Sequence, residues 1–299
     1  MKTPLQAISP SAIHRKASSH SRWGPAINKS LGVLLGKICQ YVYDFDPASL
    51  PVLGNPTATR VSDKATTPTS FAGVLRYSDK TVLAFQGTIT QKTWQSVKDW
   101  LQNFRVKRIK AMGLPGMVHE GFVTQLQMVW DGIVANLKNN TQPLYVTGHS
   151  QGAAVAALAT KALTQAGIPV TATYTFAAPR PGDDAFADSV TTPVYRFEFG
   201  DDVVPHVPFH SLSLGGFEDS INARLMAHAP QLAELMRTAS EGYRSVGRLY
   251  YGRPGEQLQE NLDAAAEDRL ARARYMLMLM AGSDLFNHHH MPNYIGMLG

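Results

Sequence analysis

Residues 143–152 read PLYVTGHSQG, a short apolar run that ends in a serine flanked by glycines, and an alanine-rich stretch follows at residues 153–166. The apolar run is typical of a buried strand, and the alanine-rich stretch of a helix. We expect so tight a turn between them that a Cβ atom on Gly148 or Gly152 would clash with neighbouring backbone. This strand–turn–helix setting predicts a nucleophilic Ser150 on a sharp turn, the alternative being a serine that only caps the helix.

Strands and helices alternate on both sides of this turn. Two β-rich runs around Ser78-Asp79-Lys80 are typical of a hairpin. Further along, strand candidates and helical patterns follow one another, with strands at residues 144–147, 173–177 and 194–199 and helices at residues 121–137 and 153–166. Such alternation favours an α/β fold, in which a mostly parallel sheet carries helices on both faces.

Residues 211–286 have a different pattern. Apolar residues recur there at helical steps on both sides of the sequence YGRPGE, residues 251–256, and no strand signal is visible. The two periodic sets are Leu225, Ala229, Leu232 and Met236, and then Leu258, Leu262, Ala265 and Ala266. We therefore predict a helical hairpin inserted at residues 211–286 into an α/β core formed by residues 1–210 and 287–299.

The composition, with 44% hydrophobic and 17% charged residues, is typical of a compact globular protein. The formal net charge of +5 is small for 299 residues and does not indicate a nucleic-acid partner. Cys39 is the single cysteine, so neither an internal disulfide nor a thiolate metal cluster can form. The first apolar run, residues 31–42, is too short and too polar for a transmembrane segment. No secretory signal is readable in residues 1–26, which leaves the location open between cytoplasm, leaderless export and a leader that the sequence omits.

A nucleophilic serine needs a base that takes its proton and an acid that orients the base. On a strand–turn–helix nucleophile the expected chain order is serine, aspartate, histidine. Asp201 and Asp202 follow the strand candidate at residues 194–199, and the triplet His288–His290 lies near the end of the sequence. Taken alone, such a triplet would be interpreted as an exposed or incidental metal-binding run. The two aspartates and the triplet are nevertheless the candidates for the acid and the base.

Seven short motifs occur in an order that resembles the class 3, or fungal-type, triacylglycerol lipases of the α/β-hydrolase fold. They are FQGT (85–88), DWLQNF (99–104), VHEGF (118–122), GHSQG (148–152), YTFAAPRPGDDAFA (174–187), DDVVPHVP (201–208) and HHMPNY (289–294). The resemblance covers roughly residues 70–210 and 287–299, and it does not cover the predicted helical insertion.

Carried over residue by residue, the resemblance implies Ser150 as the nucleophile and Asp202, in its Asp-x-Val-Pro context, as the acid. Bacterial members place the base five residues before a tyrosine, which with Tyr294 selects His289. The alternatives for the base are His288 and His290, with His206 and His228 as more distant ones.

The resemblance also implies two donors to the oxyanion, the negatively charged oxygen of the acyl-transfer intermediate. They are Thr88, through its backbone N–H and hydroxyl, and the backbone N–H of Gln151. The sequence departs from the family pattern at Gln86, where arginine is common, and at Gln151, where leucine is common. We expect the wall beside the nucleophile and the contacts of the lid to differ accordingly.

Residues 89–104 place apolar side chains along one face of a helix, at Trp94, Val97, Leu101 and Phe104. An amphipathic helix packed on the core would show the same pattern. In lipases of the family the lid helix lies here, so the resemblance implies a lid that includes Trp100 and opens at a lipid surface.

The implied reaction is acyl transfer from a lipid or other ester to water through Ser150, in transient contact with a lipid–water interface. It requires no cofactor and no metal ion. A carboxylesterase or feruloyl-type esterase on soluble esters is the alternative enzyme, since the same fold and residues serve both. A non-catalytic lipid-binding protein that keeps the fold is a third possibility. The oligomeric state stays open.

Overall fold

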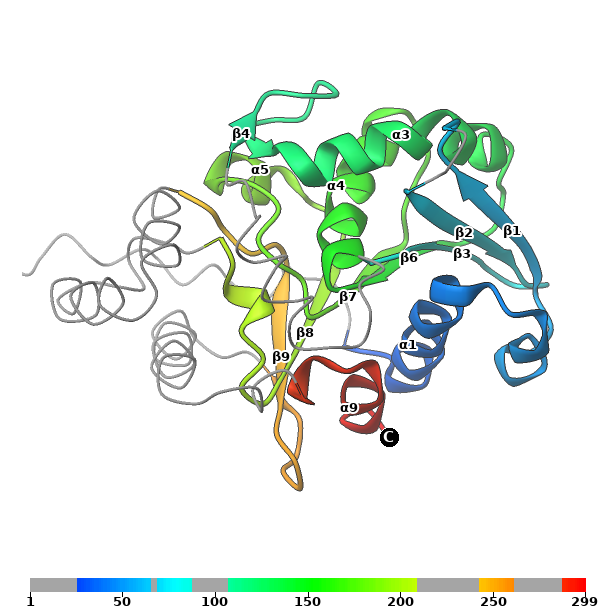
Figure 1. Cartoon of the computed structure of the whole chain (residues 1–299), viewed down its shortest axis with the longest axis vertical. Coiled ribbons are helices and arrows are strands. Elements are labelled where there is room, and N and C mark those ends of the chain that lie inside the picture. The colour runs from blue at the N-terminus through cyan, green and yellow to red at the C-terminus, as the bar shows by residue number, and fades with distance from the viewer. Residues whose placement is uncertain (1–25, 66–68, 88–106, 209–241, 261–286) are drawn as a thin grey trace, which may run out of the picture.

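A computed structural model of the chain describes residues 26–65, 69–87, 107–208, 242–260 and 287–299. An eight-stranded mixed sheet runs through the centre (Figure 1). In order across the sheet its strands are β1 (Thr57–Ser62), β2 (Phe71–Arg76), β3 (Thr81–Phe85), β6 (Leu144–His149), β7 (Ala172–Phe176), β8 (Val194–Phe199), β9 (Arg248–Gly252) and β10 (Gln259–Glu260). The strands from β3 to β9 are parallel, whereas β1, β2 and β10 pair antiparallel at the two edges.

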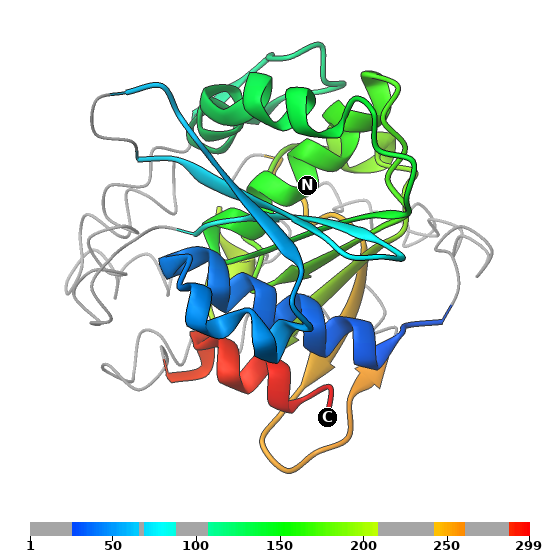
Figure 2. The ribbon, with the colours of Figure 1, turned by 90° about the vertical axis from the view of Figure 1, so that its right-hand side faces the viewer.

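Helices cover both faces of this sheet (Figure 2). Helices α3 (Glu120–Leu137) and α4 (Gln151–Gln165) lie on one face, and α1 (Lys29–Asp44) and α9 (Met291–Gly296) lie on the other. The remaining described elements are α5 (Asp184–Ser189), the 3-10 turns η2 (Pro47–Ser49), η3 (Pro51–Leu53) and η4 (Val204–His206), and a small second sheet of β4 (Arg108–Ile109) and β5 (Val118–His119). The predicted α/β fold with a mostly parallel sheet is confirmed.

Strand β3 is apolar from Val82 to Phe85 because both of its faces are buried. In β3, Leu83 packs into the core beneath α3 and α4, while its neighbours Val82 and Ala84 pack beneath α1 and α9. Successive side chains of a strand point to opposite faces, so a strand between two helical layers is buried at every position, which favours a continuous apolar run. The strict hydrophobic run of β3 is therefore the sequence signature of this three-layer arrangement.

The predicted hairpin around residues 78–80 is present, since β2 pairs antiparallel with β3 and joins it through this turn. The prediction of no strand in residues 211–286 is wrong at two places. Strand β9 extends the parallel sheet beside β8, and β10 folds back antiparallel on β9. The turn between them lies within YGRPGE, which the sequence analysis had assigned to a break between helices.

The physical reason is that β9 is only five residues long and its strand character depends on pairing with β8. A short apolar run cannot be assigned to strand or helix from its own periodicity. The remaining parts of the predicted insertion, residues 211–241 and 261–286, lie outside the described residues.

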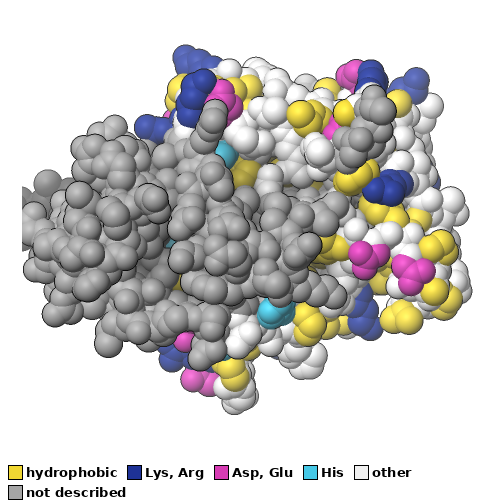
Figure 3. Space-filling view, viewed as in Figure 1, with side chains coloured by type: hydrophobic (Ala, Val, Ile, Leu, Met, Phe, Trp, Pro, Cys, Tyr) yellow, Lys and Arg dark blue, Asp and Glu magenta, His cyan; other side chains and the backbone are white. Residues whose placement is uncertain are grey.

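Charged side chains of both signs are visible on one face of the molecule. On the face seen in Figure 3, Lys and Arg side chains are interspersed with Asp and Glu, and the visible described atoms do not form one large basic patch. Among the described residues, no helix combines the length and the apolarity that crossing a membrane requires.

Candidate active site

The predicted sharp turn at Ser150 joins the end of β6 to the start of α4. Ser150 has φ 57° and ψ −131°, a strained backbone conformation for a residue with a side chain. A Cβ atom on Gly148 would overlap the backbone of Gly152, and one on Gly152 would overlap the carbonyl oxygen of Phe85. The expectation that this turn needs both glycines is confirmed. The Ser150 N–H donates to the carbonyl of Phe176 (2.9 Å), which ties the turn to β7.

Three predicted site residues meet above the carboxyl ends of the parallel strands. Ser150 Oγ lies 2.9 Å from His289 Nε2, and His289 Nδ1 lies 2.8 Å from Asp202 Oδ2. Asp202 follows β8, while His289 stands just before α9. The arrangement therefore links a hydroxyl, an imidazole and a carboxylate in one hydrogen-bonded series.

Asp202 is fully buried and accepts further hydrogen bonds. The Tyr294 hydroxyl donates to its Oδ2 (2.5 Å), and the Val204 N–H donates to its Oδ1 (3.0 Å). Burial by itself raises the pKa of Asp202. The positive charge that His289 can carry, with the hydrogen bonds from His289, Tyr294 and Val204, outweighs burial and holds this pKa below its ordinary value. The group is thus an ionised carboxylate at neutral pH, able to orient the imidazole.

The other candidate histidines occupy different positions. His288 Nδ1 accepts the backbone N–H of Asp201 (2.9 Å), which joins the loop of the acid to the loop of the base. His290 is the exposed N-cap residue of α9, and His206 is buried with its Nε2 3.3 Å from Glu198. His228 lies outside the described residues.

Of the two proposed oxyanion donors, Gln151 is the first residue of α4, so its backbone N–H lies at the positive end of the helix dipole. Thr88 lies outside the described residues, directly after Gly87. The residues assigned to the lid, Trp94, Val97, Trp100, Leu101 and Phe104, also lie outside them.

A buried histidine that the sequence pattern did not reveal supports His289, the candidate base. His149 Nε2 donates to the carbonyl oxygen of His289 (2.8 Å), while the Tyr43 hydroxyl donates to His149 Nδ1 (3.0 Å). Burial lowers the pKa of His149 to about 3, and the proximity of His289 adds to this effect. His149 is therefore neutral. Its position beside Ser150 in the motif was the one available signal, but its partner from α1 lies 106 residues away in the chain.

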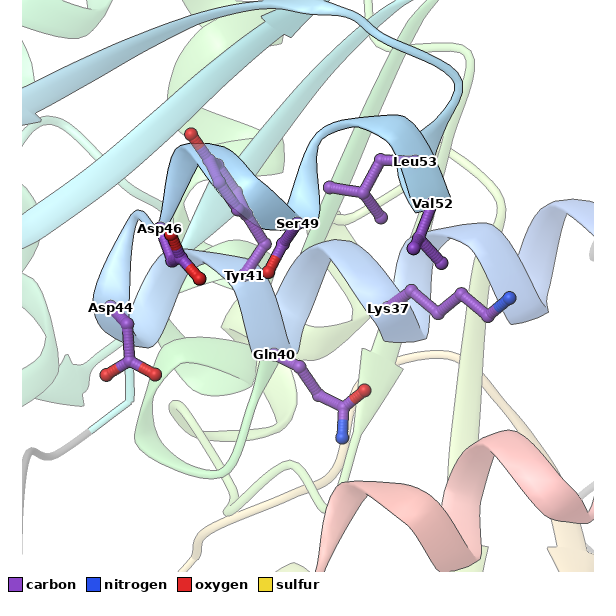
Figure 4. Close-up of a pocket in the computed structure, with 8 residues that line it drawn as sticks. All are labelled: Lys37, Gln40, Tyr41, Asp44, Asp46, Ser49, Val52 and Leu53. Carbon is purple, nitrogen blue, oxygen red and sulfur yellow. The ribbon is translucent and has the colours of Figure 1, made fainter.

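A groove of about 330 Å³ lies elsewhere, between α1 and the turns η2 and η3 (Figure 4). Its lining includes Lys37, Asp44 and Asp46 but none of the three residues of the hydrogen-bonded series. Among the residues that the structure describes, no group of three or more His, Cys, Asp or Glu side chains is placed to hold a metal ion. The candidate site is therefore the one around Ser150.

The protein-family model described as "Lipase (class 3)" matches residues 82–212. The chain is 32% identical over 178 residues to secreted mono- and diacylglycerol lipase 1 of Fusarium solani, covering 55% of this chain and 49% of that protein. It is 33% identical over 160 residues to secreted mono- and diacylglycerol lipase A of Penicillium camembertii, covering 50% of each chain. The chain thus spans about half the length of the curated relatives it matches.

The fold agrees with this match. The solved triacylglyceride lipase of Rhizomucor miehei superposes with a TM-score of 0.61 at 17% identity, covering 92% of this chain and 98% of that one. A mutant of MDLA from Penicillium cyclopium superposes with a TM-score of 0.54 at 23% identity, covering 81% and 86%. At these identities the superpositions show a shared fold. Residues 82–212 therefore match the class 3 lipase family, and the chain as a whole shares the α/β-hydrolase fold of the solved fungal lipases.

Proposed function

We propose that the chain is a lipase that hydrolyses the carboxylic esters of acylglycerols through an acyl-enzyme on Ser150. The observation that carries this proposal is the hydrogen-bonded series of Ser150, His289 and Asp202, with distances of 2.9 and 2.8 Å. A serine hydroxyl is a weak nucleophile unless a positioned base removes its proton, and this series supplies that base and its orienting acid. The match of residues 82–212 to the class 3 lipase family supports the same reaction.

In the proposed reaction Ser150 Oγ attacks the ester carbonyl while His289 Nε2 takes its proton. The carbonyl electrons move onto oxygen, and as they return the C–O bond to the alcohol breaks and the alcohol takes the proton from His289. Water then attacks the acyl-enzyme by the same two proton transfers and releases the fatty acid. Asp202 accepts the Nδ1–H of His289 throughout, which fixes the tautomer and stabilises the imidazolium.

The negative oxygen of each tetrahedral intermediate needs donors that are already in place. We assign this role to the backbone N–H of Gln151, at the start of α4, and to Thr88, which follows Gly87. Gly87, two residues after the end of β3, lies beside the strand end that carries Ser150, since a Cβ atom on Gly87 would be 2.9 Å from the carbonyl oxygen of His149. A donor from each of two adjacent strand ends would hold the oxyanion between them.

The substrates are proposed from the relatives, two of which are named as secreted mono- and diacylglycerol lipases. We propose partial glycerides and triacylglycerols as substrates, reached at a lipid–water interface, with residues 89–104 acting as the lid. Replacing Trp94 and Trp100 by serine tests the lid. We expect loss of activity on emulsions with little change on soluble esters, and equal effects on both substrates would argue against a lid.

The first test is hydrolysis of p-nitrophenyl esters from acetate to palmitate, followed by emulsions of mono-, di- and triacylglycerol. Wild type is compared with Ser150→Ala and with Ser78→Ala, a control serine that is exposed on the hairpin turn. We expect only Ser150→Ala to lose turnover, with long chains and emulsions preferred by the wild type. A preference for short soluble esters would instead make the chain a carboxylesterase, and equal rates in wild type and Ser150→Ala would exclude Ser150 as the nucleophile.

A further inference from the structure

The residues that precede Thr88 contact the first turn of α4 directly. These residues, Gln86 and Gly87, follow β3, and they and the first turn of α4 are the two donor segments. A Cβ atom on Gly152 would overlap the Phe85 carbonyl oxygen and would lie 2.9 Å from the carbonyl of Gln86. Because the segments pack this closely, a small shift of either one would change the distance between the two donors.

A series of glutamine side chains also joins these segments. Gln151 Nε2 donates to Gln125 Oε1 (2.9 Å), and Gln125 Nε2 donates to the backbone carbonyl of Gln86 (3.3 Å). Gln86 Nε2 in turn donates to the backbone carbonyl of Tyr43 at the end of α1 (2.8 Å). Gln86 and Gln125 are buried, at 1% and 9% exposure. The middle side chain, Gln125 of α3, thus bonds to both donor segments at once.

Gln125 is chemically suited to this place because a primary amide carries an acceptor and a donor at its end. Leucine of similar size offers neither, and an ionised glutamate offers only acceptors, one of which would face the Gln86 carbonyl. Hydrogen bonds in a buried site are costly to leave unmade, since water cannot replace the lost partner. Two of the three glutamines, Gln86 and Gln151, stand at the positions where this sequence departs from the pattern it resembles.

We propose that Gln125 is a positioning residue that fixes the two oxyanion-donor segments relative to each other. This inference rests on the proposed function, in which the Gln151 N–H and Thr88 stabilise the oxyanion. Gln125 acts through those donors and does not itself contact the substrate. Its effect therefore falls on the chemical step and not on substrate binding, because the oxyanion develops only in the tetrahedral transition states and intermediates.

The test compares wild type with Gln125→Leu, Gln151→Leu and the double variant, with Gln165→Leu as control. Gln165 is an exposed residue at the far end of α4 whose amide also donates to a backbone carbonyl, that of Gly113 (3.1 Å). We measure kcat and KM on a soluble p-nitrophenyl ester and the inhibition constant of a long-chain alkyl trifluoromethyl ketone. In that complex the Ser150 oxygen bonds to the ketone carbon, the proton passes to His289, and the ketone oxygen becomes a stable oxyanion.

We expect Gln125→Leu to lower kcat about 10-fold, less than the roughly 10²–10³-fold cost of deleting a donor, with KM nearly unchanged. The inhibition constant of the ketone should rise by a similar factor. A variant that is merely less stable would lose active fraction but would bind the ketone as the wild type does. We also expect the losses in Gln125→Leu and Gln151→Leu to be less than additive in the double variant, because both break the same bond.

A Gln125→Leu enzyme with wild-type kcat and ketone affinity would overturn the inference, as would a lower kcat with unchanged ketone affinity. The Gln125→Glu variant provides a second check, since it keeps the shape and the acceptor for Gln151 but replaces the donor to Gln86 by an acceptor. It should show the same rise in the inhibition constant of the ketone, and unchanged ketone affinity in it would also count against the inference. The proposed function has its own readout, because it fails if Ser150→Ala keeps wild-type turnover. If turnover depends on Ser150 but is unaffected by substitution of Gln125, only the positioning role is overturned.

Discussion

His149 makes the stability of this protein depend on pH in a way that can be calculated. Both ring nitrogens are used by the neutral imidazole, since Nδ1 accepts from Tyr43 and Nε2 donates to the carbonyl of His289. Burial, reinforced by His289, lowers the pKa of His149 to about 3 in the folded chain. In the unfolded chain an exposed imidazole has a pKa of about 6.5. The two states therefore bind different numbers of protons over the range between these values.

Between pH 6.5 and pH 3 the His149 side chain binds one proton in the unfolded chain and none in the folded chain. A difference of one bound proton makes the free energy of unfolding rise by about 1.4 kcal/mol for each unit of increase in pH. The stabilisation is complete above the unfolded pKa and is lost as the pH falls toward the folded pKa. From pH 7 to pH 5 the loss from this one residue is about 2 kcal/mol. That is a large part of a typical domain stability of about 5–15 kcal/mol.

The variant His149→Gln isolates this contribution, because glutamine keeps one acceptor and one donor but does not titrate. Urea unfolding followed by tryptophan fluorescence at pH 7 and pH 5 gives the free energy of unfolding of each protein. We expect the wild type to lose about 2 kcal/mol more than the variant between the two pH values. His290→Gln, at an exposed histidine, is the control and should behave as the wild type. The same pH dependence in wild type and His149→Gln would refute a neutral, buried His149.

Other residues give further tests. Tyr294→Phe removes a hydrogen bond to the Asp202 carboxylate (2.5 Å), so we expect unfolding at pH 7 to become easier by about 2 kcal/mol. This difference in the free energy of unfolding should shrink as the pH falls and Asp202 is protonated, because the lowered pKa of Asp202 stabilises the fold only while the carboxylate is charged. A difference that stays constant with pH would contradict this role of Tyr294. Burial raises the pKa of the Cys39 thiol to about 12, so a disulfide reagent at pH 8 should modify the protein only after unfolding. Gly36→Ala would bring a Cβ atom 2.8 Å from Cγ1 of Ile295. The overpacking cost of about 1–3 kcal/mol should exceed the helix gain of about 1 kcal/mol, so melting curves should show a lower Tm.

The turn at Ser150 could be predicted from the sequence because everything that shapes it is local. Gly148 and Gly152 are required by atoms within the same turn and the adjoining strand end, and the apolar run before them forms β6. The residue pattern alone left Asp201 and Asp202 as candidates for the acid, and the resemblance to the lipase family selected Asp202 and His289. The sequence left His288 and His290 open, and the hydrogen bond to Ser150 distinguishes His289 from both.

The features that sequence reasoning missed depend on partners far away in the chain. Strand β9 is defined by its pairing with β8, and its five residues carry too short a pattern to reveal this. The bond between Tyr43 and His149 joins residues 106 apart, and the Gln125 amide connects α3 to both β3 and α4. A buried polar side chain has no periodicity that reveals its partner, so its role appears only when the elements are placed together.

The position of His289, the proposed base, also depends on distant partners. They lie in α1, a helix that carries none of the three residues of the hydrogen-bonded series. The segment that matches the lipase family, residues 82–212, contains Ser150 and Asp202 but not His289. His289 precedes α9, which packs closely against α1 at Gly36, and Leu298, just after α9, packs against Gly32.

The end of α1 contacts the site as well. The Tyr43 hydroxyl donates to His149, which in turn holds the carbonyl of His289, and the Tyr43 carbonyl accepts the amide of Gln86. Helix α1 therefore supports His289 in two ways, by packing against α9 and through the bond from Tyr43 to His149. It also supports Gln86, which precedes the proposed oxyanion donor, through the Tyr43 carbonyl. The family-matched segment supplies the proposed nucleophile and acid, and the α1–α9 layer supports His289, whose Nε2 lies 2.9 Å from the Ser150 hydroxyl.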